Sequence, residues 1–112
     1  GNFICATTDT PYFQIGESKY GKPILDRALH YSMPLDDALR CTLISFDSTL
    51  RSNVSVGLPL DVLVYHKDSF KIPEGKRIRE DDPYFTQISK QWSETLRRGL
   101  QELPKPTADY GL

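Results

Sequence analysis

Apolar and polar residues follow several different spacings along this 112-residue chain, and each spacing predicts a particular element. Apolar and β-branched residues at positions 2–6 and 12–15 predict two strands, separated by a polar turn at 7–11 and ended by Gly16. The opening pair Gly1-Asn2 is typical of a tight hairpin turn between two strands. We therefore expect the first residues to belong to a larger sheet, with a neighbouring strand that precedes Gly1.

Two segments with helical spacing follow these strands. The first begins near Pro23, because proline suits the first turn of a helix, and its apolar face consists of Ile24, Leu25, Ala28 and Leu29. The second begins near Pro34, with acidic residues at its positive end, and runs to about Leu50. Its core stripe consists of Leu35, Leu39, Leu43, Phe46 and Leu50. A neighbouring stripe of small residues lets this helix pack flat between a sheet and another layer; it consists of Ala38, Cys41 and Ser45.

The C-terminal part of the chain predicts a strand pair and a long helix. The continuous apolar run at 62–65 favours a central strand covered on both faces, and residues 76–80 are expected to form the returning edge strand. Asp82 followed by Pro83 is typical of a helix start, and Pro104 ends that helix. Its buried face is predicted to consist of Phe85, Ile88, Trp92, Leu96, Leu100 and Leu103. The sequence thus predicts one α+β domain over residues 1–112, with an incomplete sheet and a tail at 104–112.

Composition excludes some classes of partner. Fourteen basic and fifteen acidic residues leave a formal charge of −1 without a basic stripe, so we expect no nucleic-acid partner. No apolar run approaches the ~20 residues that span a bilayer, so we expect no membrane partner. Cys5 and Cys41 lie in apolar settings and are interpreted as buried thiols rather than a disulfide. This interpretation favours a soluble protein of the cytoplasm.

Local chemistry leaves two polar segments as candidate sites. The histidines, His30 and His66, belong to no cluster with metal-ligand spacing, and the Gly-x-Ser-x-Gly elbow of serine hydrolases is absent. The segment QIGESKYGKPILDR, residues 14–27, can bind a developing negative charge through backbone N–H groups, or can be an ordinary strand-to-helix turn. The segment STLRSNVSVG, residues 48–57, is either a site or a helix C-terminus satisfied by side-chain hydrogen bonds.

Taken together, GESKYGKPILDR and DSTLRSNVSVGLPLDVLVY resemble the C-terminal half of a proteasome-type peptidase, and most closely the bacterial proteasome homologues called Anbu. The resemblance runs from Gly1 to about Trp92. It implies the N-terminal nucleophile hydrolase fold, in which two antiparallel sheets lie between helix layers. It also implies that a preceding half carries a terminal threonine, whose hydroxyl attacks an amide carbonyl with its own α-amino group as base. This chain alone is therefore expected to lack the nucleophile.

The resemblance also implies roles for individual residues. Ser55 matches a serine that supports the nucleophile, Ser52 stands where proteasomes have an aspartate, and Glu17 stands where they have a serine. Either Asn53 compensates for the charge lost at position 52 or the base is tuned less strongly, and a carboxylate at Glu17 can replace that charge. Backbone carbonyls at Thr49, Ser52 and Ser55 match a family site for a structural Na⁺, Mg²⁺ or Ca²⁺ ion, and no other cofactor is expected.

The resemblance finally implies partners and leaves two functions open. The expected partners are the missing half of the subunit, further copies in a ring or helical homo-oligomer, and a peptide or amide substrate. The first interpretation is a threonine-type amide hydrolase. The alternative is a proteasome-like scaffold subunit that assembles without hydrolysis.

Overall fold

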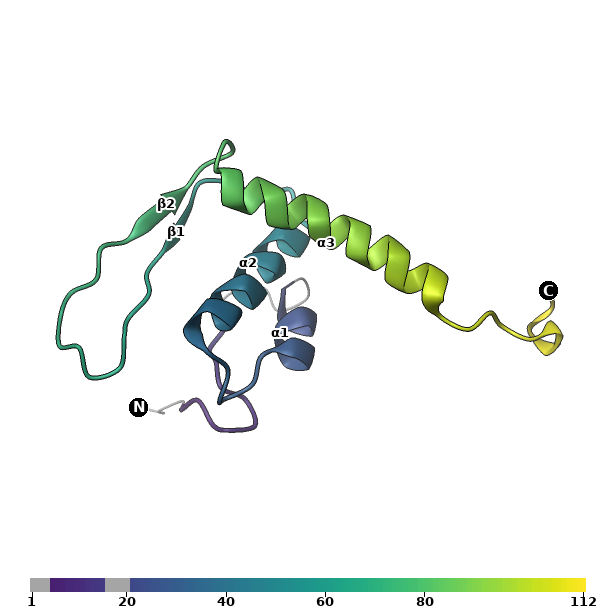
Figure 1. Cartoon of the computed structure of the whole chain (residues 1–112), viewed down its shortest axis with the longest axis horizontal. Coiled ribbons are helices and arrows are strands. Elements are labelled where there is room, and N and C mark those ends of the chain that lie inside the picture. The colour runs from purple at the N-terminus through teal and green to yellow at the C-terminus, as the bar shows by residue number, and fades with distance from the viewer. Residues whose placement is uncertain (1–4, 16–20) are drawn as a thin grey trace.

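The computed structural model describes residues 5–15 and 21–112 of the chain. The elements of this part follow the order α1 (Lys22–Ala28), α2 (Leu35–Ser52), β1 (Leu60–Val62), β2 (Lys76–Ile78), α3 (Pro83–Glu102) and a final 3-10 turn (Ala108–Tyr110). Figure 1 shows α1 beside α2, with α3 crossing the C-terminal end of α2 and extending beyond it. The predicted helices are confirmed, each within a few residues of its expected ends.

Local signals explain where the helices start and stop. Pro23 lies in the first turn of α1, and Asp36 and Asp37 lie in the first turn of α2, where the helix dipole favours negative charge. The side chain of Asp82 caps α3 by accepting a hydrogen bond of 2.9 Å from the N–H of Phe85. α3 ends before Pro104, whose ring cannot continue a helix.

The strand pair is short and antiparallel. Leu60 pairs with Ile78, Asp61 with Arg77, and Val62 with Lys76. Arg77 donates two hydrogen bonds to Asp61, of 2.8 Å and 3.1 Å, which fix the register from the exposed face. This contact with Arg77 lowers the pKa of the Asp61 carboxyl. The sheet therefore consists, within the described residues, of one hairpin held at its base.

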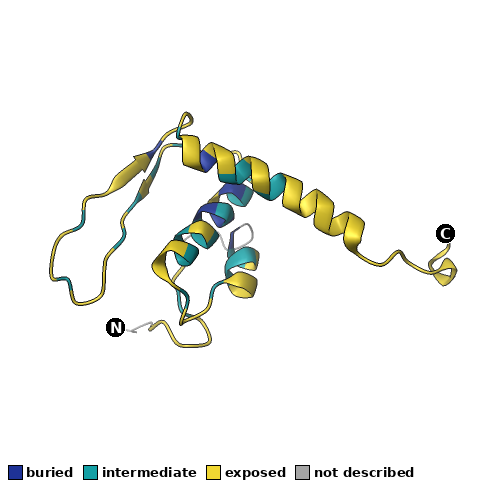
Figure 2. Ribbon diagram, viewed as in Figure 1, coloured by how far each residue is buried: buried dark blue, intermediate teal, exposed yellow. Residues whose placement is uncertain are grey.

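A small core forms where α2, the base of the hairpin and the start of α3 meet. Its buried members are Leu43, Ile78 and Phe85. Partly buried side chains surround them: Leu39, Leu50, Leu58, Leu60, Val62 and Ile88. Figure 2 shows buried residues on α2, at the base of the hairpin and at the starts of α1 and α3, while the outer turns of α3, the hairpin loop and the residues after α3 are mainly exposed.

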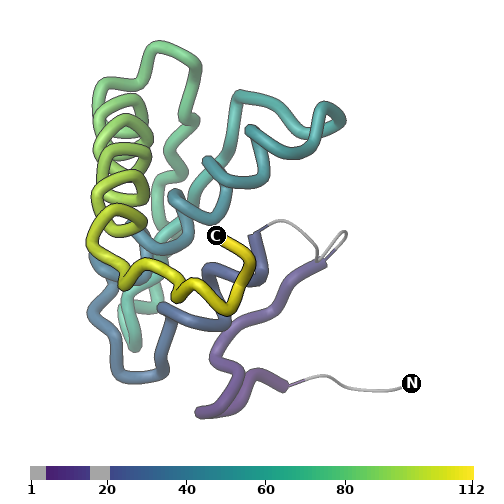
Figure 3. Tube along the Cα trace, turned by 90° about the vertical axis from the view of Figure 1, so that its right-hand side faces the viewer, coloured from purple at the N-terminus to yellow at the C-terminus, as the bar shows by residue number. Residues whose placement is uncertain are grey.

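The molecule is open and elongated. Its radius of gyration is 17.2 Å, against about 13 Å for a compact domain of this length. Its accessible surface is 9466 Å², against roughly 6,300 Å² expected for a compact monomer of this mass. Figure 3, turned by 90°, places α3 and residues 5–15 on opposite sides of the molecule. The described elements therefore leave large apolar areas uncovered.

The strand predictions are largely wrong. Residues 12–15 and the described part of 2–6 form no strand, and the apolar run at 62–65 contributes only Val62 to β1. Leu63 and Tyr65 are 63% and 50% exposed, so this run is not a central strand here. The edge strand predicted at 76–80 ends at Ile78. A strand needs a hydrogen-bonding neighbour, and the described part of the chain supplies none at these positions.

Two predictions of burial also need correction. The distal part of the α3 stripe, Leu96, Leu100 and Leu103, is exposed, because this end of α3 extends beyond α2 (Figure 1). Both thiols are free, as expected, but Cys5 is exposed rather than buried. Cys41 is half-buried, and this burial raises the pKa of its thiol. Among the residues described, no helix is long and apolar enough to cross a bilayer.

Candidate functional site

The candidate site lies at the C-terminal end of α2. Ser52 is the last helical residue, and Asn53 follows in an extended conformation. The N–H of Asn53 donates a 2.9 Å hydrogen bond to the Thr49 carbonyl, and the Thr49 hydroxyl donates to the Ser45 carbonyl at 3.0 Å. The helix end is thus closed by backbone and side-chain hydrogen bonds before the chain turns towards β1.

Asn53 organises the turn that follows α2. Its side-chain oxygen accepts one hydrogen bond from the N–H of Ser55 at 3.0 Å and another from the Ser55 hydroxyl at 2.6 Å. Its backbone carbonyl accepts the N–H of Val56 at 3.2 Å. This is the Asx-type geometry in which an asparagine mimics a backbone turn. The Asn53 side chain therefore orders the residues that follow α2, while the backbone N–H of Asn53 pairs with the Thr49 carbonyl of the helix end.

The predicted site residues differ in their burial and in their position relative to the turn. Ser52 and Ser55 are both exposed around the turn, three residues apart, and Thr49 is half-buried one turn earlier. Glu17 lies outside the described residues. The sequence named Asn53 only as a possible substitute for the charge missing at position 52, although Asn-x-Ser directly after a helix is a recognisable signal for a turn of this type.

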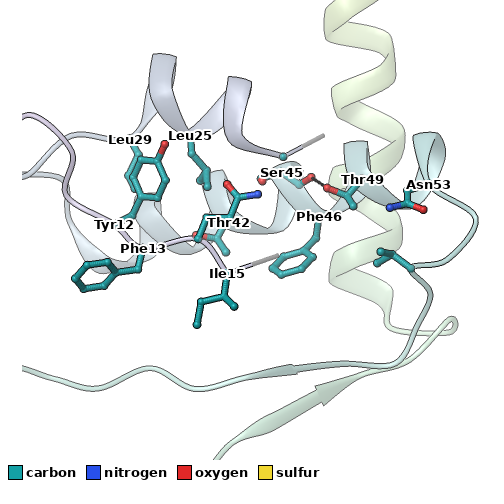
Figure 4. Close-up of a pocket in the computed structure, with 13 residues that line it drawn as sticks. Tyr12, Phe13, Ile15, Leu25, Leu29, Thr42, Ser45, Phe46, Thr49 and Asn53 are labelled. Carbon is teal, nitrogen blue, oxygen red and sulfur yellow. Dashed lines mark hydrogen bonds between the residues drawn. The ribbon is translucent and has the colours of Figure 1, made fainter. Parts of the chain in front are cut away.

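A groove runs along α2 and ends at this turn. It has a volume of about 350 Å³ and lies between α1, α2 and residues 12–15 (Figure 4). Ser45 and Thr49 on α2, and Asn53 directly after it, are spaced four residues apart and contribute polar groups to its lining. Apolar side chains form the rest of the wall and include Phe13, Ile15, Leu25 and Phe46. Thr49 and Asn53 thus face the groove, whereas Ser52 and Ser55 do not contribute to its lining.

The two polar segments singled out in the sequence meet at Gly21. This buried glycine precedes α1, and a Cβ placed on it would lie 3.1 Å from the Thr49 hydroxyl and still closer to that of Ser45. The Gly21 end of this segment, just before α1, is therefore in direct contact with the α2 residues that lead to the turn. Only a residue without a side chain permits this approach.

A charged cluster ties residues 12–15 to α1. The Tyr12 hydroxyl donates to Asp26, and Lys22 forms an ion pair of 2.7 Å with the same carboxylate. Lys22 first, and Tyr12 second, lower the pKa of the Asp26 carboxyl. Because the cluster is exposed, it contributes orientation more than stability.

The chemistry of the helix end fits a hard cation. Carbonyl groups in the last turn of a helix have no partner within the helix, and the dipole makes that end negative. The Thr49 carbonyl accepts one hydrogen bond, from Asn53, and its second lone pair can still bind an ion. The described residues contain no group of three histidine, cysteine or carboxylate side chains placed to hold a metal. The oxygens that could hold an ion at this end are the backbone carbonyls of Thr49, Ser52 and Ser55.

No protein-family model matches the chain, and no curated protein matches it. Solved structures do. The chain is 62% identical to the Anbu protein in a helical assembly from Pseudomonas aeruginosa, with a TM-score of 0.93 over 97% of this chain and 45% of that one. The chain is similar to the Anbu proteins. Anbu (ancestral β-subunit) from Yersinia bercovieri is also 62% identical, with a TM-score of 0.89 over 95% and 45% of the two chains.

A third Anbu structure is similar to this chain over about the same share of both chains. Anbu from Hyphomicrobium sp. strain MC1 is 53% identical to this chain, with a TM-score of 0.88 over 94% of this chain and 45% of that one. The chain therefore spans about half the length of the Anbu proteins that it matches. The resemblance to Anbu proposed from the sequence is confirmed over nearly the whole chain.

Proposed function

We propose that this chain is the C-terminal half of a proteasome-type threonine amide hydrolase subunit, whose nucleophile comes from the other half. The observation that carries the proposal is the 62% identity, at a TM-score of 0.93, to about half of an Anbu subunit. The contact of Gly21 with Ser45 and Thr49 supports it, because it brings both candidate segments to one place. The complete subunit acts on a peptide or amide substrate in the cytoplasm.

The reaction would begin with attack of the threonine hydroxyl on an amide carbonyl, the α-amino group of the same threonine accepting the proton. Ser55 orients that amino group. Its hydroxyl proton is engaged by the side-chain oxygen of Asn53 at 2.6 Å, so the hydroxyl oxygen is left with lone pairs that can accept an N–H. Asn53 thereby selects the acceptor role of Ser55.

Two further residues tune the base. A serine at position 52 supplies no fixed charge where proteasomes have an aspartate, and the carboxylate of Glu17 supplies it instead. A negative charge near the α-amino group raises the pKa of that group and strengthens it as a base. A cation on the backbone oxygens of Thr49, Ser52 and Ser55 would add rigidity to the turn.

The alternative function is a scaffold subunit that assembles without hydrolysis. The helical assembly formed by the Pseudomonas aeruginosa Anbu complex favours a homo-oligomer under either function. A terminal threonine on the complete subunit, together with release of product from an amide substrate, would support the hydrolase function. Assembly of the parent protein without turnover of the amide substrate would support the scaffold function.

Substitution of Ser55 tests the proposed role in the complete subunit. Ser55→Ala should lower kcat on the order of 10²-fold, because a displaced base is felt in the transition state. Its melting temperature and assembly should stay near those of the parent, since the lost hydrogen bond is exposed. Ser69→Ala, which removes a hydroxyl from the hairpin loop, is the matched control. Parental turnover by Ser55→Ala would remove this residue from the site.

A further inference from the structure

A buried carboxylate joins α2 to α3 just before the candidate turn. Asp47 is 5% exposed, and the Ser89 hydroxyl of α3 donates to it a hydrogen bond of 2.5 Å. Arg51, one turn later on α2, lies 3.4 Å from the other carboxylate oxygen and donates to the Ser89 hydroxyl at 3.1 Å. The contacts form a closed triangle between two helices.

This triangle is poorly explained as a source of stability alone. A carboxylate that leaves water loses solvation, and replacement of a buried charged group by an apolar one of similar size is often neutral or stabilising. The guanidinium of Arg51 is largely exposed, so its attraction to Asp47 is screened by solvent. What the triangle does provide is direction, since hydrogen bonds fix the rotation of α2 against α3 while apolar contacts permit sliding.

The opposite face of α2 is held by a different contact. Ser45 precedes Asp47 by two residues, which places the two side chains about 200° apart around the helix. Ser45 and Thr49 pack on Gly21 at the start of α1, and Asp47 and Arg51 bind Ser89 on α3. The last turns of α2 are therefore held between α1 and α3. Arg51, directly before Ser52, is the last residue of α2 that takes part in these contacts.

We infer that Asp47 and Ser89 are positioning residues, which hold the last turn of α2 so that Ser52, Asn53 and Ser55 keep the geometry needed by the nucleophile. The inference rests on the proposed function for its catalytic consequence. Its structural consequence is independent of catalysis: without the Ser89 hydroxyl, the hydrogen bonds of Asn53 and Val56 in the turn should open more often.

The experiment compares three variants of the complete subunit. Ser89→Ala removes the donor to Asp47, Ser89→Thr keeps a hydroxyl at the same position, and Ser93→Ala removes a hydroxyl one turn further along α3. For each variant, kcat and KM on an amide substrate are measured, together with hydrogen exchange over a peptide covering residues 50–57. We expect Ser89→Ala to lower kcat about tenfold with KM unchanged, and to speed exchange in this peptide about tenfold. Ser89→Thr should restore most of both, and Ser93→Ala should match the parent.

The two measurements separate this inference from the proposed function. If the parent subunit does not hydrolyse the substrate, the proposed function fails, and the exchange measurement alone tests the positioning. Exchange at 50–57 that is equal in Ser89→Ala and the parent overturns the inference, whatever the activity. Faster exchange throughout the chain in Ser89→Ala also overturns it, because the residue would then act on the fold as a whole.

Discussion

Gly21 at the start of α1 packs directly on Ser45 of α2, with no room for a side chain between them. The Thr49 hydroxyl lies 3.1 Å from the place where a Cβ of residue 21 would be. The backbone of Gly21 has an ordinary right-handed conformation, with φ of −82°, so glycine is needed here for space and not for its dihedral angles. This contact joins the strand-to-helix segment to the groove on α2.

We therefore expect Gly21→Ala to destabilise the complete subunit by about 1–3 kcal/mol, because the added methyl group overpacks the contact with Ser45. The smaller unfolded-state entropy of alanine offsets part of this loss. Denaturant unfolding measures the change. Gly99→Ala is the control: it lies inside α3 with nothing near its Cβ position and should stabilise by about 0.5–1 kcal/mol. Equal effects of the two substitutions would contradict the close packing at Gly21.

The N-cap of α3 should make stability depend on pH. The hydrogen bond from the Phe85 N–H lowers the pKa of Asp82 from the ordinary value of 3.8, and Lys76 at 3.5 Å lowers it further. A depressed pKa contributes stability above the unfolded-state value, and this contribution is lost as the pH falls through the folded-state value. Asp82→Ala should therefore lower the melting temperature at neutral pH, and the gap to the parent should close below about pH 4.

The neighbouring residue supplies the control for that titration. Asp81→Ala removes an exposed carboxylate one position earlier in the chain and should change the melting temperature less at neutral pH. Melting curves of the three proteins at several pH values make the comparison. A gap between Asp82→Ala and the parent that stays constant down to pH 3 would show that the cap contributes by packing rather than by charge.

Expressed alone, residues 1–112 should not behave as an independent domain. The accessible surface of 9466 Å² includes large exposed apolar side chains, among them Ile15, Val54, Phe70, Ile72 and Leu100. Apolar patches of this extent bind other surfaces or aggregate. We expect the isolated segment to aggregate, or to form a stable complex when the remaining half of the subunit is supplied. A soluble monomer with a sharp cooperative melt, seen by light scattering and calorimetry, would refute this.

The cation proposed at the end of α2 predicts stabilisation by ions. An ion that binds only the folded state at a hundred times its dissociation constant adds about 2.7 kcal/mol, so the complete subunit should melt higher in Na⁺, Mg²⁺ or Ca²⁺ than in chelator. A high-resolution density map should show oxygen ligands from Thr49, Ser52 and Ser55 at about 2.0–2.6 Å from Mg²⁺ or Ca²⁺. Identical melting temperatures in all these conditions, together with a density peak whose distances to the surrounding oxygens are those of a hydrogen-bonded water, would show that the turn needs no ion.

The sequence alone was sufficient to predict the position and the approximate ends of the three helices. Their apolar spacing, the proline in the first turn of α1 and the Asp82 cap are local features, so α1, α2 and α3 lie close to the predicted bounds. Sequence also showed the resemblance to Anbu, because a long motif such as DSTLRSNVSVGLPLDVLVY carries its information residue by residue. Neither conclusion depends on contacts between residues far apart in the chain.

Tertiary structure decided the rest, because it depends on neighbours that local patterns do not name. A strand exists only with a hydrogen-bonded partner, so the apolar runs at 12–15 and 62–65 did not become the predicted strands. The contact of Gly21 with Ser45 joins residues 24 positions apart, and that of Asp47 with Ser89 joins residues 42 positions apart. The packing of α1 and of α3 on α2, which no periodicity within one helix predicts, holds the last turns of α2 just before the Ser55 turn.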